Sequence, residues 1–133
     1  MNGKLVDTNV IIRFLKGQTE LFSLFDDMEN LYVSSISVGE LMYGAELSQK
    51  KDYNSAGYYS FCEQMKVLNV DMEIAKRYGK IKSVLKLKGR PIPENDIWIA
   101  ATALTANLLL VTADSDFENI PDLLIEKMSM SLT

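Results

Sequence analysis

The sequence of 133 residues predicts an α/β fold around a mainly parallel sheet. Short apolar runs alternate with stretches of helical periodicity, which is the pattern of βαβ units. The first apolar run, residues 5–7, is short for an edge strand and typical of a central buried strand. Because no repeat, low-complexity tract or linker interrupts the pattern, we expect residues 1–133 to form a single domain.

The predicted elements follow one another as a strand and two helices, three times over, and then two final strands. The expected strands cover residues 5–7, 31–34, 67–70, 108–112 and 123–126. The expected helices cover residues 9–16 and 21–29, a segment that carries Glu40, and residues 53–65, 71–88 and 93–106. Each helix has apolar residues at a spacing of three or four, or is bounded by capping residues.

Capping and helix-breaking residues define several of these boundaries. Ser35 and Ser37 are candidate N-caps for the helix that carries Glu40. Asp71 is expected to cap the long helix 71–88, and Gly89 to end it. Pro93 stands at or near the first position of the next helix, where its fixed φ angle is favourable.

Composition excludes several classes of protein. Apolar residues make up 47% of the chain, as in a globular protein, and no apolar run approaches the roughly 20 residues that span a bilayer. One cysteine, Cys62, excludes an internal disulfide, and no signal peptide is visible, so we expect a cytoplasmic protein without a membrane segment. The absence of histidine removes catalytic triads and the usual zinc sites.

The net charge of −4 argues against non-specific binding to nucleic acid, but the charge is unevenly distributed. Residues 71–90 contain two acids, Asp71 and Glu73, against a larger group of basic residues. These are Lys76, Arg77, Lys80, Lys82, Lys86, Lys88 and Arg90. The stretch is either a solvated helix face or a surface that contacts phosphates.

Acidic residues stand where predicted strands end and where predicted helices begin. Asp7 ends the first strand, Glu40 opens a helical pattern, and Asp96 lies in the first turn of another helix. Asp114 and Asp116 follow the strand at 108–112. In an open parallel sheet, the carboxyl ends of the strands meet at one crevice, where ligands bind. We therefore expect these acids to lie close together.

Each acid has an ordinary structural explanation when it is taken alone. Asp7 could cap a helix, Asp96 could interact with a helix dipole, and aspartates are common in turns. Their recurrence at places that a parallel sheet brings together favours a shared site. Such a cluster needs positive charge to be stable, and Mg²⁺ or Mn²⁺ prefer oxygen ligands. A metal-dependent phosphodiesterase, which needs no histidine, is therefore our hypothesis.

Four segments resemble the four motifs of PIN-domain ribonucleases, and within that family the VapC toxins of bacterial and archaeal toxin–antitoxin pairs. The segments are residues 5–11 (LVDTNVI), 40–44 (ELMYG), 95–103 (NDIWIAATA) and 111–117 (VTADSDF). The resemblance implies a three-layer α/β/α PIN-like fold with a central, mainly parallel sheet. It also implies RNA cleavage that depends on Mg²⁺ or Mn²⁺, usually by a homodimer, and inhibition by a cognate VapB-like antitoxin.

The resemblance also assigns roles to individual residues. By motif, the implied catalytic residues are Asp7, Glu40, Asp96, Asp114 and Asp116. Asp7, Asp96 and Asp114 are the implied metal ligands, and the implied supporting residues behind them are Thr8, Asn9 and Thr112. Relatives often have a glycine shortly before the third acid, and asparagine where Asp114 stands. These departures leave open how Asp114 and Asp116 divide their roles.

Two other functions fit parts of the pattern. A non-catalytic PIN-like module could bind RNA or protein without cutting, although the complete set of acids argues against it. A phosphoacceptor signalling domain also gathers aspartates at strand ends, but it needs a lysine at the end of a late strand. Residues 108–116 contain no lysine, and Lys127 comes too late in the chain.

Overall fold

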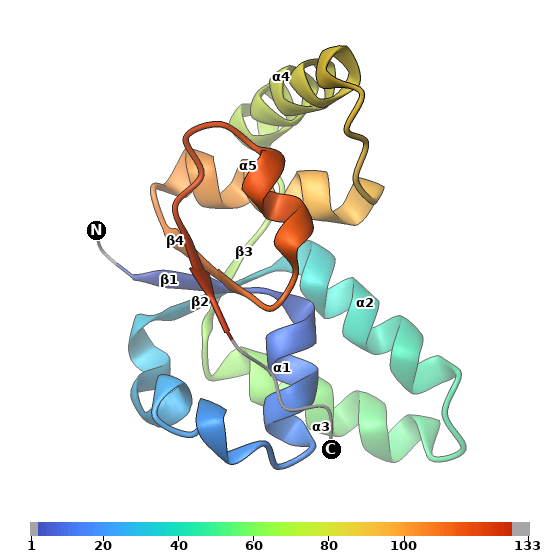
Figure 1. The fold of residues 1–133 in the computed structure, drawn as a ribbon. Coiled ribbons are helices and arrows are strands. Elements are labelled where there is room, and N and C mark those ends of the chain that lie inside the picture. Colours follow the sequence, from blue (N-terminus) through green and yellow to red (C-terminus); the bar gives the residue numbers. More distant parts are fainter. Residues whose placement is uncertain (1–2, 129–133) are drawn as a thin grey trace.

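The structure is a computed structural model that describes residues 3–128, and its centre is a five-stranded sheet (Figure 1). The strands are β1 (Lys4–Val6), β2 (Leu31–Ser34), β3 (Lys66–Leu68), β4 (Leu109–Thr112) and β5 (Ile125–Lys127). Their order in the sheet is β3-β2-β1-β4-β5, and every neighbouring pair is parallel. The predicted parallel sheet is confirmed, with strand boundaries within two residues of those expected.

Helices cover both faces of this sheet. The α-helices are α1 (Thr8–Leu15), α2 (Ser35–Glu46), α3 (Lys51–Glu63), α4 (Met72–Lys88) and α5 (Glu94–Ala106). Shorter 3₁₀ segments are η1 (Thr19–Leu21), η2 (Leu24–Asn30) and η3 (Ser115–Asn119). Figure 1 shows α4 and α5 on one side of the sheet and α1 and α3 on the other. This arrangement confirms the three-layer α/β/α architecture.

The central strand β1 supplies both faces of the core. Leu5 packs into a cluster with residues of α4 and α5, whereas its neighbour Val6 packs into a second cluster with residues of α1 and α2. Both side chains are fully buried. Successive side chains of a strand point to opposite faces, so a strand as short as β1 can join the two clusters. The expectation of a central buried strand is confirmed.

The long helix α4 begins and ends where the sequence indicates. Oδ1 of Asp71 accepts a hydrogen bond from the backbone N–H of Ile74 at 2.9 Å and caps the helix. Gly89 follows the last turn with a φ angle of 66°, a left-handed conformation that glycine adopts without strain. At the end of α5, Asn107 takes the same conformation with a φ angle of 56°.

Two predictions about local structure are wrong. The α-helix expected over residues 21–29 consists of the 3₁₀ segments η1 and η2, and Asp27 interrupts η2 with non-helical angles. The Asp27 carboxylate accepts a hydrogen bond from the side chain of Asn30, and such short local bonds compete with helical ones. The N-cap of α2 is Ser34, whose Oγ accepts a bond from the N–H of Ile36 at 3.0 Å, so Ser35 and Ser37 lie inside the helix.

The strand order determines where a ligand can bind. From β1 the chain moves outward to β2 and β3, then returns across the sheet through α4 and α5 to β4, beside β1 on its other side. The carboxyl ends of β1 and β4 therefore flank the point where the order reverses, which is the usual ligand site of such sheets. Within residues 3–128, no helix is long and apolar enough to cross a membrane.

Candidate active site and metal centre

Asp7 connects β1 to α1, and both oxygen atoms of its carboxylate accept hydrogen bonds. Its side chain is buried, with 4% of the residue's surface exposed. Oδ1 accepts a hydrogen bond from the backbone N–H of Thr8 at 2.8 Å, so Asp7 does cap α1. Oδ2 accepts a bond from the hydroxyl of Thr112 at 2.7 Å, which ties it to the end of β4. Asp7 therefore caps α1 and also lies in the crevice between β1 and β4.

Thr112 links the two strands that flank the crevice. It is fully buried at the end of β4, and its hydroxyl donates to Asp7 while accepting the backbone N–H of Asp114 at 3.0 Å. A hydroxyl has one proton to donate, so this geometry directs that proton to Asp7. In the same region, Oδ1 of Asn9 accepts the N–H of Ala113 at 3.4 Å. The turn after β4 is therefore fixed to the start of α1.

Glu40 reaches the crevice from α2. Its Oε1 accepts a hydrogen bond from the hydroxyl of Thr8 at 2.7 Å, across 32 residues of sequence. Gly44 lies one turn further along α2, and a Cβ atom there would have no neighbouring atom within 4 Å, so the space is open. One turn before Glu40, the buried hydroxyl of Ser37 has no hydrogen-bond partner among the described residues.

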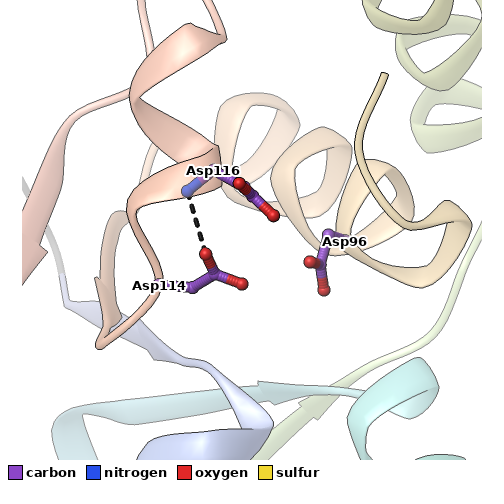
Figure 2. Close-up of side chains that lie close together, drawn as sticks. All are labelled: Asp96, Asp114 and Asp116. Atoms are coloured by element: carbon purple, nitrogen blue, oxygen red, sulfur yellow. Dashed lines mark hydrogen bonds between the residues drawn. The ribbon is translucent and has the colours of Figure 1, made fainter. Parts of the chain in front are cut away.

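Asp96, Asp114 and Asp116 form the tightest group of carboxylates in the described chain. Each offers an oxygen atom, and these atoms all lie within 4.8 Å of one another. Figure 2 shows the three side chains, from the first turn of α5 and from the turn into η3, directed into one common space. The backbone N–H of Asp116 donates to Oδ1 of Asp114 at 2.9 Å, which holds these two residues together.

Burial and mutual repulsion raise the pKa of two of these acids. Burial raises the pKa of Asp7 to about 6; the bonds from Thr112 and Thr8 lower it, and the charges of Glu40 and Asp114 raise it. The pKa of Asp96 rises to about 7, first through burial and then through the four other acids, Asp7, Asp114, Glu40 and Asp116. Asp96 therefore lies in the electrostatic field of the four other acids.

The five sequence-predicted acids lie at one end of the sheet, as we expected, but they are not equivalent. Asp96, Asp114 and Asp116 form the close group, whereas Asp7 and Glu40 stand outside it and are held by Thr112 and Thr8. The position of Asp116 beside Asp96 could not be read from the sequence, because it depends on how η3 turns. All three supporting residues, Thr8, Asn9 and Thr112, bond within the site.

The donor set fits a hard divalent cation. Carboxylate oxygens are the ligands of Mg²⁺ and Mn²⁺, and ligands on opposite sides of one Mg²⁺ are about 4 Å apart. The carboxylate oxygens of Asp96, Asp114 and Asp116 all lie within 4.8 Å of one another, so one cation can lie between them. A cation there would also offset the burial of Asp96 and its repulsion by the other acids, which together raise its pKa.

Among residues 3–128, no lysine forms an ion pair with the five acids. Lys127, at the end of β5, pairs with Glu118 at 3.8 Å and not with one of the five acids. On α4, Lys82 pairs with Glu94 at 3.2 Å and contacts the ring of Tyr78. The basic side chains of residues 71–90 are exposed, and α4 packs against α5, the helix that carries Asp96.

Comparison with known proteins places this arrangement in a family. The family model of the PIN domain matches residues 4–123. Ribonuclease VapC1 of Haemophilus influenzae (strain R2866) is 35% identical over 124 residues, which cover 90% of this chain and 92% of that protein. The tRNA(fMet)-specific endonuclease VapC of Salmonella typhimurium is 35% identical over 127 residues, or 92% of this chain and 95% of its own length.

Solved structures agree with the sequence relatives. The crystal structure of DNA-bound VapBC from Salmonella typhimurium contains a chain with a TM-score of 0.90 and 33% identity, covering 96% of this chain and 98% of its own. VapBC-1 from nontypeable Haemophilus influenzae gives a TM-score of 0.83 at 32% identity, covering 93% of this chain and 96% of its own.

Proposed function

This chain belongs to the PIN-domain family and to its VapC ribonucleases, and we propose that it is the endoribonuclease toxin of a toxin–antitoxin pair, cutting RNA with Mg²⁺ or Mn²⁺. The observation that carries the metal dependence is the convergence of five acids on one crevice, where burial, and then the charges of the four other acids, raise the pKa of Asp96 to about 7. The chain has no histidine to act as a general base, and a bound cation lowers the pKa of a water molecule without one.

We assign the cation to Asp7, Asp96 and Asp114, with Asp116 as an additional ligand on the side of Asp96. The support for Asp116 is its carboxylate oxygen within 4.8 Å of those of Asp96 and Asp114. When bound, Mg²⁺ or Mn²⁺ supplies Lewis acidity toward a phosphodiester oxygen, a more acidic water and charge compensation for the leaving oxygen.

The remaining residues orient these ligands. Thr112 fixes the Asp7 carboxylate by its hydroxyl, and Thr8 does the same for Oε1 of Glu40. Oε2 of Glu40 has no hydrogen-bond partner among the described residues, and we assign it to accept a hydrogen bond from the attacking water.

We also propose the partners that the relatives suggest. The solved relatives are VapBC complexes, so a cognate VapB-like antitoxin is the expected inhibitor, and a homodimer the expected toxin assembly. We expect the protein to act in the cytoplasm. The substrate class is RNA, since the curated relatives include a VapC ribonuclease and a tRNA(fMet)-specific endonuclease.

A cleavage assay tests this function. Purified protein is incubated with total RNA, with Mg²⁺ or Mn²⁺ and with a chelator, alongside the variants Asp7→Asn and Asp96→Asn. We expect metal-dependent cutting by the wild type and a loss of at least about 100-fold in each variant, since an essential catalytic group typically contributes 10²–10⁴-fold. Full cleavage by both variants would refute the site. Binding of RNA without any cutting would support the non-catalytic module instead.

A further inference from the structure

We propose that Tyr43 is the platform on which a nucleobase of the substrate RNA stacks next to the cut. The inference rests on the proposed function and adds a binding residue to it. Tyr43 lies three residues after Glu40 on α2, so its Cβ atom is a surface neighbour of Glu40, about 5–6 Å away. A ring at that distance can reach a nucleotide next to the phosphate that lies at the acids.

The Tyr43 side chain has no partner of its own. The residue is 67% exposed, and among residues 3–128 no ring contact or hydrogen bond engages it. Two other aromatic residues stand beside the acids in the sequence. Trp98, two positions after Asp96, is already stacked on Tyr78, with ring centroids 3.8 Å apart. Phe117, directly after Asp116, is fully buried. Tyr43 is therefore the ring beside the acids that remains available for stacking.

The periodicity of α2 places Tyr43 on the side of the helix that faces the site. Ile36, seven residues earlier, projects from nearly the same side, because seven residues make almost two complete turns. Ile36 packs against the hydrophobic cluster that includes α5, the helix that carries Asp96. Tyr43 lies two turns further along the same side of α2, where it is exposed to solvent.

The surface around Tyr43 is open. Gly39 and Gly44 flank this part of α2, and a Cβ atom at either position would have no neighbouring atom within 4 Å. Because glycine has no side chain, neither position places one beside the ring, which leaves room for a flat base. Leu47, one turn further along and 70% exposed, extends the apolar surface.

The chemistry of the pocket explains why an uncharged contact is needed there. Five carboxylates repel the phosphates of RNA, and a bound cation compensates only part of that charge. Stacking on an aromatic ring adds affinity for a single strand without adding charge, and it accepts any base. We infer a single-stranded substrate segment at this point, with one unpaired base against Tyr43.

Binding of two RNA probes tests the proposal. The probes are a fluorescently labelled ten-nucleotide oligo(A) RNA and an RNA of the same length with one central abasic ribose. Anisotropy is measured with Ca²⁺ present to neutralise the carboxylates, for the wild type, Tyr43→Ala and Tyr43→Phe. Tyr53→Ala is the matched control, because Tyr53 on α3 is also exposed, at 78%, and lies beside Leu15 at the end of α1, whereas Asp7 and Thr8 lie at the start of that helix.

We expect Tyr43→Ala to weaken binding of oligo(A) about tenfold, while Tyr43→Phe and Tyr53→Ala bind like the wild type. The abasic probe should bind the wild type less tightly than oligo(A), and Tyr43→Ala should no longer distinguish the two probes. Equal binding by wild type and Tyr43→Ala overturns the proposal, as does a defect of Tyr43→Ala confined to antitoxin binding or dimerisation. Failure of the wild type to cut total RNA overturns the proposed function itself, which the cleavage assay reports separately.

Discussion

At the scale of single residues, two threonine hydroxyls determine the geometry of the site. Thr112 bridges Asp7 and the backbone of Asp114, and Thr8 holds Glu40. The sequence predicts that these threonines support the acids, because they stand beside them in the motifs. It does not predict which oxygen each hydroxyl contacts, since those bonds join segments that are 105 and 32 residues apart.

Replacement of Thr112 by valine tests how much the two hydrogen bonds of its hydroxyl contribute, apart from the volume of the side chain. Valine keeps the volume but leaves Oδ2 of Asp7 and the N–H of Asp114 without their buried partner. We expect a loss of about 1–3 kcal/mol in the free energy of unfolding, and RNA cleavage reduced at least tenfold. Urea denaturation and initial cleavage rates measure the two effects. Thr112→Ser, which keeps the hydroxyl, should have nearly the stability and cleavage rate of the wild type. A valine variant that matches the wild type in both measurements would contradict the role assigned to Thr112.

The raised pKa values predict how the stability of the metal-free protein depends on pH. The pKa is about 6 for Asp7 and about 7 for Asp96 in the folded state, against an ordinary value of 3.8 for each. The folded state binds these protons more tightly than the unfolded state. Their stabilising effect is therefore complete below about pH 4 and is lost as the pH rises through 6 to 7.

Thermal unfolding in the presence of a chelator tests this pH dependence. Between pH 5 and pH 7.5, the wild type should lose more in Tm than the double variant Asp7→Asn, Asp96→Asn, which cannot titrate at these positions. Mg²⁺ or Mn²⁺ at pH 7.5 should restore stability to the wild type. Parallel pH profiles of the two proteins would contradict the assignment of the raised pKa values to these aspartates.

At the scale of elements, capping residues allow the ends of α4 to be predicted from the sequence. The 3₁₀ segments η1 and η2 could not be predicted in this way. Asp71 and Gly89 mark the ends of α4 in the sequence and in the structure. The sequence predicts an α-helix over residues 21–29, but the Asp27 carboxylate accepts a bond from the Asn30 side chain and the segment forms 3₁₀ turns. Periodicity alone does not report this competition.

Removal of the cap of α4 should lower stability without affecting the chemistry. The Asp71→Ala variant loses the bond from Oδ1 to the N–H of Ile74, and a helix cap of this kind is worth about 1 kcal/mol. We expect a lower urea midpoint, with the m-value and the specific cleavage rate of the folded protein unchanged. A fall in cleavage rate at full folding would indicate that α4 controls the active site.

At the scale of the whole molecule, the strand order creates the site. The sequence predicts parallel strands with acids at their ends, but not which strands are neighbours. The order β3-β2-β1-β4-β5 brings β1 and β4 together, so residues 7 and 112–116 meet although more than 100 residues separate them in sequence. The long return through α4 and α5 delivers Asp96 to the same end of the sheet.

The central claim is that a divalent cation neutralises these converging carboxylates, and calorimetric titration of Mn²⁺ or Mg²⁺ into the protein at pH 7.5 tests it most directly. We predict saturable binding to the wild type and an affinity reduced at least tenfold in Asp96→Asn, which removes a charge from the closest group. Glu20→Gln, at an exposed acid in η1 on another part of the chain, should bind the cation like the wild type. No binding to the wild type, or equal affinity of the wild type and Asp96→Asn, would contradict the account.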